Sequence, residues 1–204
     1  MTPLAITLYS DFLCPYCYLL EQNLKKLAAS YRFDIHWTGF EIHPELPPGG
    51  ASPSVLGEAG WDALWERLGA LAAEWKIPIR RPEHLPNTHL ALEAAEFARA
   101  QGKLEEFRDL VFKAYFLEAQ DIGDHQVLRG LGERVGLDGA ALSKALDEEE
   151  FFDTVQDNRE KALDDLVTVV PVLLIEGLRL IGAQPVEEIE RMIQKALEKR
   201  KEAN

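Results

Sequence analysis

Strand-like patterns occur only toward the two ends of this chain, and the long stretch between them has the periodicity of helices. Residues 4–10 (LAITLYS) have the composition of a strand, 18–31 repeat leucines at helical spacing, and 33–42 alternate as a second strand would. Toward the other end, TVVPVLLI reads as a buried strand, GLRLIG as its hairpin partner after a Glu-Gly turn, and PVEEIERMIQKALEK as an amphipathic helix. The two ends therefore predict a β-α-β unit and a β-β-α unit.

The middle of the chain predicts an all-helical insertion. A loop rich in proline and glycine, HPELPPGGASPS, ends the first unit, and helical patterns then continue with Asn87 and Asp124 as N-caps. One apolar stripe in this region has the 3.6-residue period and is interpreted as core, namely Trp61, Leu64, Trp65, Leu68, Leu71 and Trp75. We expect an α/β protein in which residues 1–50 and 167–204 form one domain and 51–166 form an inserted helical domain.

The net charge indicates which partners to expect, and the apolar runs indicate the compartment. The net charge is -13, which disfavours nucleic acid and anionic membranes as partners. The sequence shows no targeting pattern at its start, and its longest apolar run, VTVVPVLLI, is far shorter than the ~20 residues of a membrane-spanning helix. These features predict a cytoplasmic protein, and structural disulfides are rare in that compartment.

Both cysteines of the chain lie in the stretch SDFLCPYCY, between the first strand and the first helix. With Cys14 at the N-cap and Pro15 at the first helical position, the free N–H groups of Tyr16 and Cys17 point toward the Cys14 sulfur. These groups and the helix dipole favour the thiolate of Cys14. Cys17 lies on the same helical face and can resolve a mixed disulfide formed by Cys14.

Other interpretations of the pair are weaker. A zinc site needs four ligands, and the nearest histidines, His36 and His43, have a spacing outside the usual range. A cysteine nucleophile of the protease kind needs a partner histidine that no pattern marks. A CxxC sequence after the first strand of a β-α-β unit is itself typical of thioredoxin-like redox proteins.

Pro171 is the second candidate feature. Its position at the start of an apolar strand fits an ordinary trans proline at a strand edge, and most X-Pro bonds are trans. A cis Val170-Pro171 bond would instead place its loop beside the cysteines. The backbone of Val170 could then pair with an extended substrate chain.

Four stretches resemble the DsbA family of thioredoxin-fold oxidoreductases, and within it the cytoplasmic FrnE-like subgroup: SDFLCPYCY, WTGFEIHPELPPGG, PNTHLALEAAEFARAQGKLEEFRDLVFKAYFLEAQDIGDHQVL and VVPVLLIEGLRLIGAQP. The resemblance implies a thioredoxin fold interrupted by a helical domain. It also implies a nucleophilic Cys14, a resolving Cys17 and a cis-proline at Pro171 that faces them. The Pro15-Tyr16 dipeptide differs from the Pro-His of the periplasmic oxidant, so the resemblance does not imply a strongly oxidising potential.

The expected function is therefore thiol:disulfide exchange through the pair Cys14 and Cys17, with support from Pro15, Tyr16 and Pro171 and with Val170 as a substrate contact. The expected partners are disulfide- or thiol-containing proteins or peptides, and glutathione or another thiol reductant; no cofactor and no metal are expected. Two alternatives remain. One is an isomerase or glutathione-transferase-like enzyme of the same fold, and the other is a redox-sensing, client-binding (holdase) module.

Overall fold

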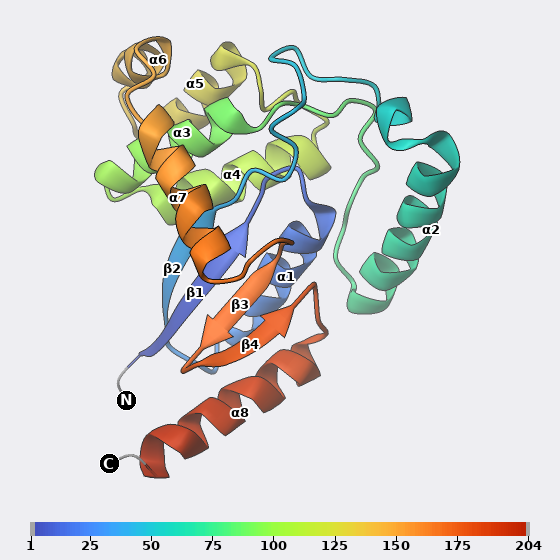
Figure 1. Ribbon diagram of the computed structural model, residues 1–204, viewed down its shortest axis with the longest axis vertical. Helices are drawn as coiled ribbons and strands as arrows, with labels where there is room; N and C mark the ends of the chain where they lie inside the picture. Colours follow the sequence, from blue (N-terminus) through green and yellow to red (C-terminus); the bar gives the residue numbers. More distant parts are fainter. Residues whose placement is uncertain (1–2, 203–204) are drawn as a thin grey trace.

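Four strands from the two ends of the chain form one mixed sheet. The computed structural model describes residues 3–202, and its strands are β1 (Leu4–Ser10), β2 (Phe33–Gly39), β3 (Val172–Ile175) and β4 (Leu178–Ile181). Their order in the sheet is β2-β1-β3-β4 (Figure 1). β1 and β2 are parallel, whereas β1–β3 and β3–β4 are antiparallel. The predicted β-α-β and β-β-α units are confirmed, and together they give the α/β thioredoxin-like fold.

The hairpin between β3 and β4 forms at the predicted Glu-Gly turn. Glu176 and Gly177 have φ values of 48° and 75°, so both central residues are left-handed. Turns of this kind match the right-handed twist of the flanking strands, and glycine adopts the conformation without a steric cost. The turn sets the register in which Leu173 pairs with Leu180.

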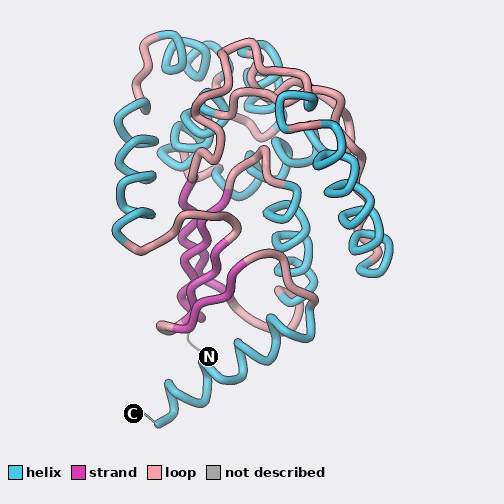
Figure 2. Tube along the Cα trace, turned by 45° about the vertical axis from the view of Figure 1, so that its right-hand side comes forward, coloured by secondary structure: helices cyan, strands magenta, loops and turns pink. Residues whose placement is uncertain are grey.

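Helices cover the two faces of the sheet unequally. α1 (Pro15–Leu27) and α8 (Val186–Glu202) pack against one face, whereas α7 (Phe152–Asp164) lies on the other side of the strands (Figure 2). The buried side chains on the first face alternate along β1, as the period of a strand requires. A smaller apolar cluster holds α7 and the following loop to the opposite face, through Tyr9, Ala162, Val167 and Val172.

The inserted region is helical, as predicted. It contains η1 (Pro53–Leu56), α2 (Glu58–Trp75), α3 (His89–Ala100), α4 (Leu104–Phe116), α5 (His125–Arg134), α6 (Gly139–Asp147) and α7. The apolar stripe of α2 is core: Trp61, Trp65 and Leu68 are buried, and the other three members pack against them. No helix within residues 3–202 has the length and apolarity that a membrane span needs.

One hydrophobic core extends from the sheet into the insertion. It includes Leu8 of β1, Leu20 of α1, Phe112 of α4 and Leu128 of α5. The division of the chain into domains at residues 50/51 and 166/167 stays a prediction. The packing itself is continuous across those points.

The predicted N-cap of α5 is confirmed, whereas the N-cap of α3 lies one residue after the predicted one. Asp124 is the N-cap of α5, and its carboxylate accepts the N–H groups of Gln126 and Val127. The prediction for α3 is wrong by one residue, because Thr88 and not Asn87 is its N-cap. Asn87 still satisfies the first turn, since its Oδ1 accepts the N–H of His89 at 2.9 Å.

Candidate active site

Cys14 lies at the junction between β1 and α1. Its φ of -81° and ψ of 113° are those of an extended N-cap residue, and α1 begins at Pro15. The carbonyl of Cys14 accepts the N–H of Cys17 at 3.1 Å, which closes the first turn. Because the N-cap makes no side-chain cap bond, its sulfur is left for other contacts near the positive end of the helix.

The two sulfur atoms have different surroundings. Both thiols are free, and the exposed fraction is 6% for Cys14 and 0% for Cys17. Burial raises the pKa of the Cys17 thiol, and the neighbouring Cys14 raises it further. A backbone hydrogen bond from Asp11 and a side-chain hydrogen bond from Ser10 oppose this rise in pKa. Cys14 is therefore the more exposed of the two thiols, and burial disfavours the thiolate of Cys17.

The loop before β3 faces the first cysteine. The Val170-Pro171 peptide bond is cis, as the family resemblance implies. The Sγ of Cys14 lies 3.6 Å from the carbonyl oxygen of Val170 and can donate to it. Residues that are 156 positions apart in the sequence thus meet at one point.

Hydrogen bonds hold the loop between α7 and β3, residues 165–171, to the sheet at several points. The hydroxyl of Tyr9 donates to the carboxylate of Asp165, and burial is the main cause that raises the pKa of this tyrosine. The guanidinium of Arg179 donates to the carbonyls of Asp165 and Leu166. At the other end of the loop, the N–H of Gly182 donates to the carbonyl of Pro171 at 2.8 Å. These bonds hold the loop against β1 and β4.

Apolar side chains stand exposed on the same loop. Leu166 is 79% exposed and Val169 is 53% exposed, and Ile181, which pairs with Val172, is also 53% exposed. Their side chains project into solvent beside the loop, so they form an apolar rim.

Asp11 joins three segments around the cysteines. Its carboxylate accepts the N–H of Leu13 at 3.0 Å and the N–H of Ile42 at 2.7 Å, and the side chain of Thr88 also hydrogen bonds to it. Burial raises the pKa of this carboxyl to about 6, although the three hydrogen bonds lower it. Asp11 is thus an anchor of the turn that carries Cys14.

Sequence reasoning did not select three buried residues close to the first turns of α1, namely Ser10, Glu21 and Arg108. The hydroxyl of Ser10 donates to Oε1 of Glu21 at 3.4 Å, and the side chain of Ser10 lowers the pKa of the Cys17 thiol. Arg108 of α4 pairs with the other carboxylate oxygen of Glu21 at 2.8 Å. The signal in the sequence is the spacing of Cys17 and Glu21, four residues apart on one helical face.

The structure brings the sequence-predicted residues to one place. Cys14, Pro15 and Cys17 occupy the first turn of α1, and partly buried Tyr16 lies between them. The loop of Val170 and Pro171 lies against Cys14. Within residues 3–202, no group of three or more His, Cys, Asp or Glu side chains is arranged to hold a metal ion.

The fold and this site define a thioredoxin-fold protein with a cysteine pair at the first turn of the helix after β1. The profile of the DSBA-like thioredoxin domain matches residues 5–194, so the chain belongs to that family. The uncharacterized protein YwbO of Bacillus subtilis is 30% identical over 194 residues, which cover 92% of this chain and 94% of YwbO.

Two solved structures show the same fold over nearly the whole chain. A probable DsbA oxidoreductase of Streptomyces coelicolor, SCO1869, superposes with a TM-score of 0.84 at 21% identity, covering 95% of this chain and 90% of its own. A 2-hydroxychromene-2-carboxylate isomerase superposes with a TM-score of 0.82 at 20% identity, covering 98% of this chain and 99% of its own. The likeness in fold thus extends to one protein named as a probable oxidoreductase and to one named as an isomerase.

Proposed function

We propose that this protein is a thiol:disulfide oxidoreductase that works through Cys14 and Cys17. The observation that carries the proposal is the arrangement at the first turn of α1. The more exposed Cys14 lies at the N-cap, a buried Cys17 lies one turn below it, and the Val170 carbonyl lies 3.6 Å from the Cys14 sulfur. A nucleophile and a resolving thiol need these unequal surroundings.

The reaction that this geometry supports has two exchanges. The Cys14 thiolate attacks one sulfur of a substrate disulfide, so a Cys14–substrate disulfide forms and the other substrate sulfur leaves as a thiolate. The Cys17 thiolate then attacks the Cys14 sulfur, the Cys14–Cys17 disulfide forms, and the second substrate thiolate leaves. The substrate gains two electrons and the protein loses two. The reverse sequence oxidises a dithiol, and an incomplete cycle exchanges disulfides.

The substrate class that we favour is an extended peptide segment that carries a cysteine. The cis bond before Pro171 and the 3.6 Å distance from the Val170 carbonyl to the Cys14 sulfur support a role for this backbone in contacting a bound chain. The exposed Leu166 and Val169 would pack against apolar side chains next to the substrate cysteine. Glutathione, or another small thiol, would return the pair to its starting state. We propose that this activity takes place in the cytoplasm, the compartment that the sequence analysis predicts, where a close cysteine pair favours catalysis over a structural disulfide.

Cysteine variants test the proposal. Cys14→Ser removes the nucleophile, so reduction of a small aromatic disulfide should fall to the uncatalysed rate. Cys17→Ser leaves the attack intact and removes the resolving thiol, so a mixed disulfide should accumulate. Mass spectrometry would place it on Cys14, because no third cysteine exists in the chain. Turnover by the Cys14→Ser variant at the wild-type rate would rule the proposal out.

A redox titration of the pair against glutathione decides the direction of electron flow. A pair that rests reduced at the cytosolic glutathione poise indicates a reductase or isomerase, and one that rests oxidised indicates an oxidase. A difference of 30 mV corresponds to about 1.4 kcal/mol, so the measurement resolves modest changes in thiolate stabilisation.

A second candidate function is a glutathione-dependent isomerase. It is favoured by the isomerase structure that superposes over 98% of this chain, and by the 2-hydroxychromene-2-carboxylate isomerase of Sphingobium xenophagum, which is 28% identical over 141 residues. Those residues cover 67% of this chain and 71% of the isomerase. A buried second thiol at Cys17 has no part in such a reaction. Glutathione-dependent turnover that survives Cys17→Ser would favour this candidate.

The client-binding module remains as a third possibility from the sequence. It predicts that an unfolded client binds equally to the oxidised protein, the reduced protein and a variant without cysteines. The oxidoreductase instead predicts redox-dependent capture that needs Cys14.

A further inference from the structure

We propose that the outer edge of β2 binds an extended segment of a basic partner protein, which joins the four-stranded sheet as a further strand. The surface consists of residues 32–35 and is called the β2 edge below. It lies away from the cysteines, so the inference goes beyond the proposed exchange activity. The juxtaposition of free backbone groups, an open cleft and two exposed charges carries it.

β2 is the outermost strand on one side of the sheet, and it pairs only with β1. The C=O of Arg32 points toward β1, because it accepts the N–H of Leu4 at 2.9 Å. Backbone groups alternate in direction along a strand, so the N–H and C=O groups of Phe33 and Ile35 point away from β1. No hydrogen bond within residues 3–202 engages these outward groups.

The free part of this edge ends at Trp37. The C=O of Trp37 accepts a hydrogen bond from the guanidinium of Arg99 at 2.5 Å, so a side chain of α3 closes the edge there. Residues 33–35 contain no proline, and their register with β1 is unbroken by a bulge. Prolines and bulges are the usual means of blocking an exposed edge, so the β2 edge is open to an added strand.

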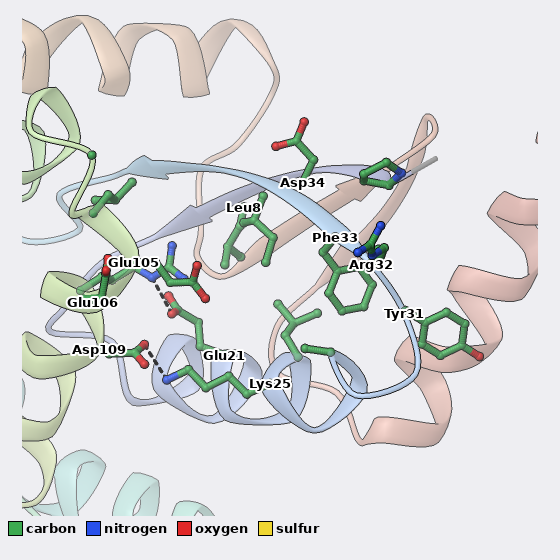
Figure 3. A pocket seen from close by; sticks show the side chains of 17 residues that line it. Leu8, Glu21, Lys25, Tyr31, Arg32, Phe33, Asp34, Glu105, Glu106 and Asp109 are labelled. Atoms are coloured by element: carbon green, nitrogen blue, oxygen red, sulfur yellow. Dashed lines mark ion pairs between the residues drawn. The ribbon is translucent and has the colours of Figure 1, made fainter. Parts of the chain in front are cut away.

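A cleft beside this edge has room for such a strand. It has a volume of about 1000 Å³, lies between β2, α1 and α4, and is lined by Phe33, Ile35 and Leu104 but by neither cysteine. Figure 3 shows Phe33 directed from β2 toward α1 and Asp34 directed to the opposite side of the strand. An added strand would therefore place two side chains in the cleft, opposite Phe33 and Ile35, and the side chain between them beside Asp34.

Two exposed charges define the chemistry of the added strand. Arg32 and Asp34 both line the cleft, and their separation of two residues follows the alternation of one strand face. Opposite charges on neighbouring strands stabilise the pairing, whereas like charges destabilise it. We therefore expect a basic residue opposite Asp34, an acidic residue opposite Arg32, and apolar residues opposite Phe33 and Ile35. An antiparallel segment then has the order apolar-basic-apolar-acidic.

The charge of the whole protein favours a basic partner over a second copy of this chain. Each copy carries a net charge of -13, so two copies repel each other. A partner of net positive charge is instead attracted to this protein, and such attraction speeds encounter and helps to select the partner.

Three synthetic peptides test the inference on the full chain by NMR titration of the isotope-labelled protein. SGVKVESG carries the expected order, and it should slow hydrogen exchange at the amides of Phe33 and Ile35. SGVEVKSG has the same composition with its charges exchanged, and should bind about tenfold more weakly, because both cross-strand pairs become repulsive. SGVKVESG with both valines N-methylated keeps its side chains and charges, and should also bind about tenfold more weakly, because two peptide N–H donors are lost.

A charge exchange in the protein should reverse the preference. Arg32→Glu combined with Asp34→Lys leaves the net charge unchanged, and this variant should bind SGVEVKSG more tightly than SGVKVESG. Glu66→Lys combined with Arg67→Glu is the matched control, because it makes the same exchange at exposed positions of α2. The control should keep the wild-type preference.

Several results would overturn the inference. They are equal affinity for the two charge orders, full affinity after N-methylation, and no change in the amide signals of the β2 edge up to about 1 mM SGVKVESG. A dimer of the wild-type protein that Asp34→Lys abolishes, measured by sedimentation, would show that a second copy occupies the edge, and would overturn the inference too. These measurements involve no thiol chemistry, so their outcome is independent of the cysteine variants that test the proposed function.

Discussion

Asp11 shows how one buried carboxylate can serve the structure at an energetic cost. It is fully buried beside Glu41, and it links the turn before Cys14 to Ile42 and to Thr88. Desolvation disfavours its charged form, which raises the pKa of the carboxyl from 3.8 to about 6. The hydrogen bonds hold the active-site turn in place, but the ionised carboxylate weakens the folded state.

This shift in pKa predicts a pH dependence of stability. Below about pH 4 the carboxyl is protonated in both states, and between about pH 4 and pH 6 only the unfolded state ionises. The contribution of this carboxyl to the free energy of unfolding is therefore full at low pH and is lost as pH rises toward 6. For a pKa shift of this size the loss is about 3 kcal/mol. The difference in unfolding free energy between wild type and Asp11→Asn should shrink by that order from pH 4 to pH 7, as measured by denaturant unfolding.

Glu105→Gln serves as the control for this measurement, because Glu105 is exposed at the surface. Its difference from wild type should vary little over the same pH range. A constant difference between wild type and Asp11→Asn from pH 4 to pH 7 would contradict the role assigned to burial.

Helix ends illustrate what local sequence decides at the scale of an element. Asp124 stands before α5, and its carboxylate accepts two N–H groups that have no partner within the helix. The cap involves only neighbouring residues, so the sequence predicts it well. For α3, the choice between Asn87 and Thr88 depends on the path of the preceding loop, where Asn87 also donates to the carbonyl of Leu46.

The cap of α5 can be tested by stability alone. Asp124→Ala should lower the unfolding free energy by about 1 kcal/mol, because two N–H groups of the first turn lose their acceptor. Asp124→Asn keeps an acceptor oxygen and should lie within a few tenths of wild type. Thermal unfolding of the three proteins distinguishes these outcomes, and equal losses in both variants would show that charge, not the cap bond, is responsible.

At the scale of the whole molecule, a buried ion pair joins the helix that carries the cysteines to the inserted helices. Arg108 of α4 pairs with Glu21 of α1, and its guanidinium lies over the ring of Trp37 at 5.8 Å. Beside it, Lys25 pairs with Asp109, and these side chains are about one third and one quarter exposed. Both pairs join α1 to α4, but they differ in their contact with water.

Because only the first pair is buried, breaking each pair should lower the free energy of unfolding by a different amount. Arg108→Met leaves the carboxylate of Glu21 buried without its cation, so unfolding should require about 3 to 5 kcal/mol less. Lys25→Met removes a pair that water screens, and should cost less than about 1 kcal/mol. Denaturant unfolding of both variants provides the comparison, and similar losses would argue against burial as the deciding factor.

Strand and helix patterns, the cysteine pair and the order of elements could be read from the sequence because they depend on local periodicity and spacing. The alternation in LAITLYS and the proline after Cys14 placed the first strand and the helix start within the observed bounds. Family resemblance added the cis bond at Pro171, where local physics alone favoured trans.

Tertiary structure decided which distant residues surround the thiols. Val170 reaches Cys14 from 156 positions away, Arg108 reaches Glu21 from α4, and Asp11 meets Ile42 and Thr88. No local pattern marks these contacts, because burial and Coulomb energy depend on the packing of whole elements. The sequence alone determined that two cysteines stand at the start of a helix, whereas folding determined that Cys14 keeps slight exposure beside the Val170 carbonyl and that Cys17 is fully buried.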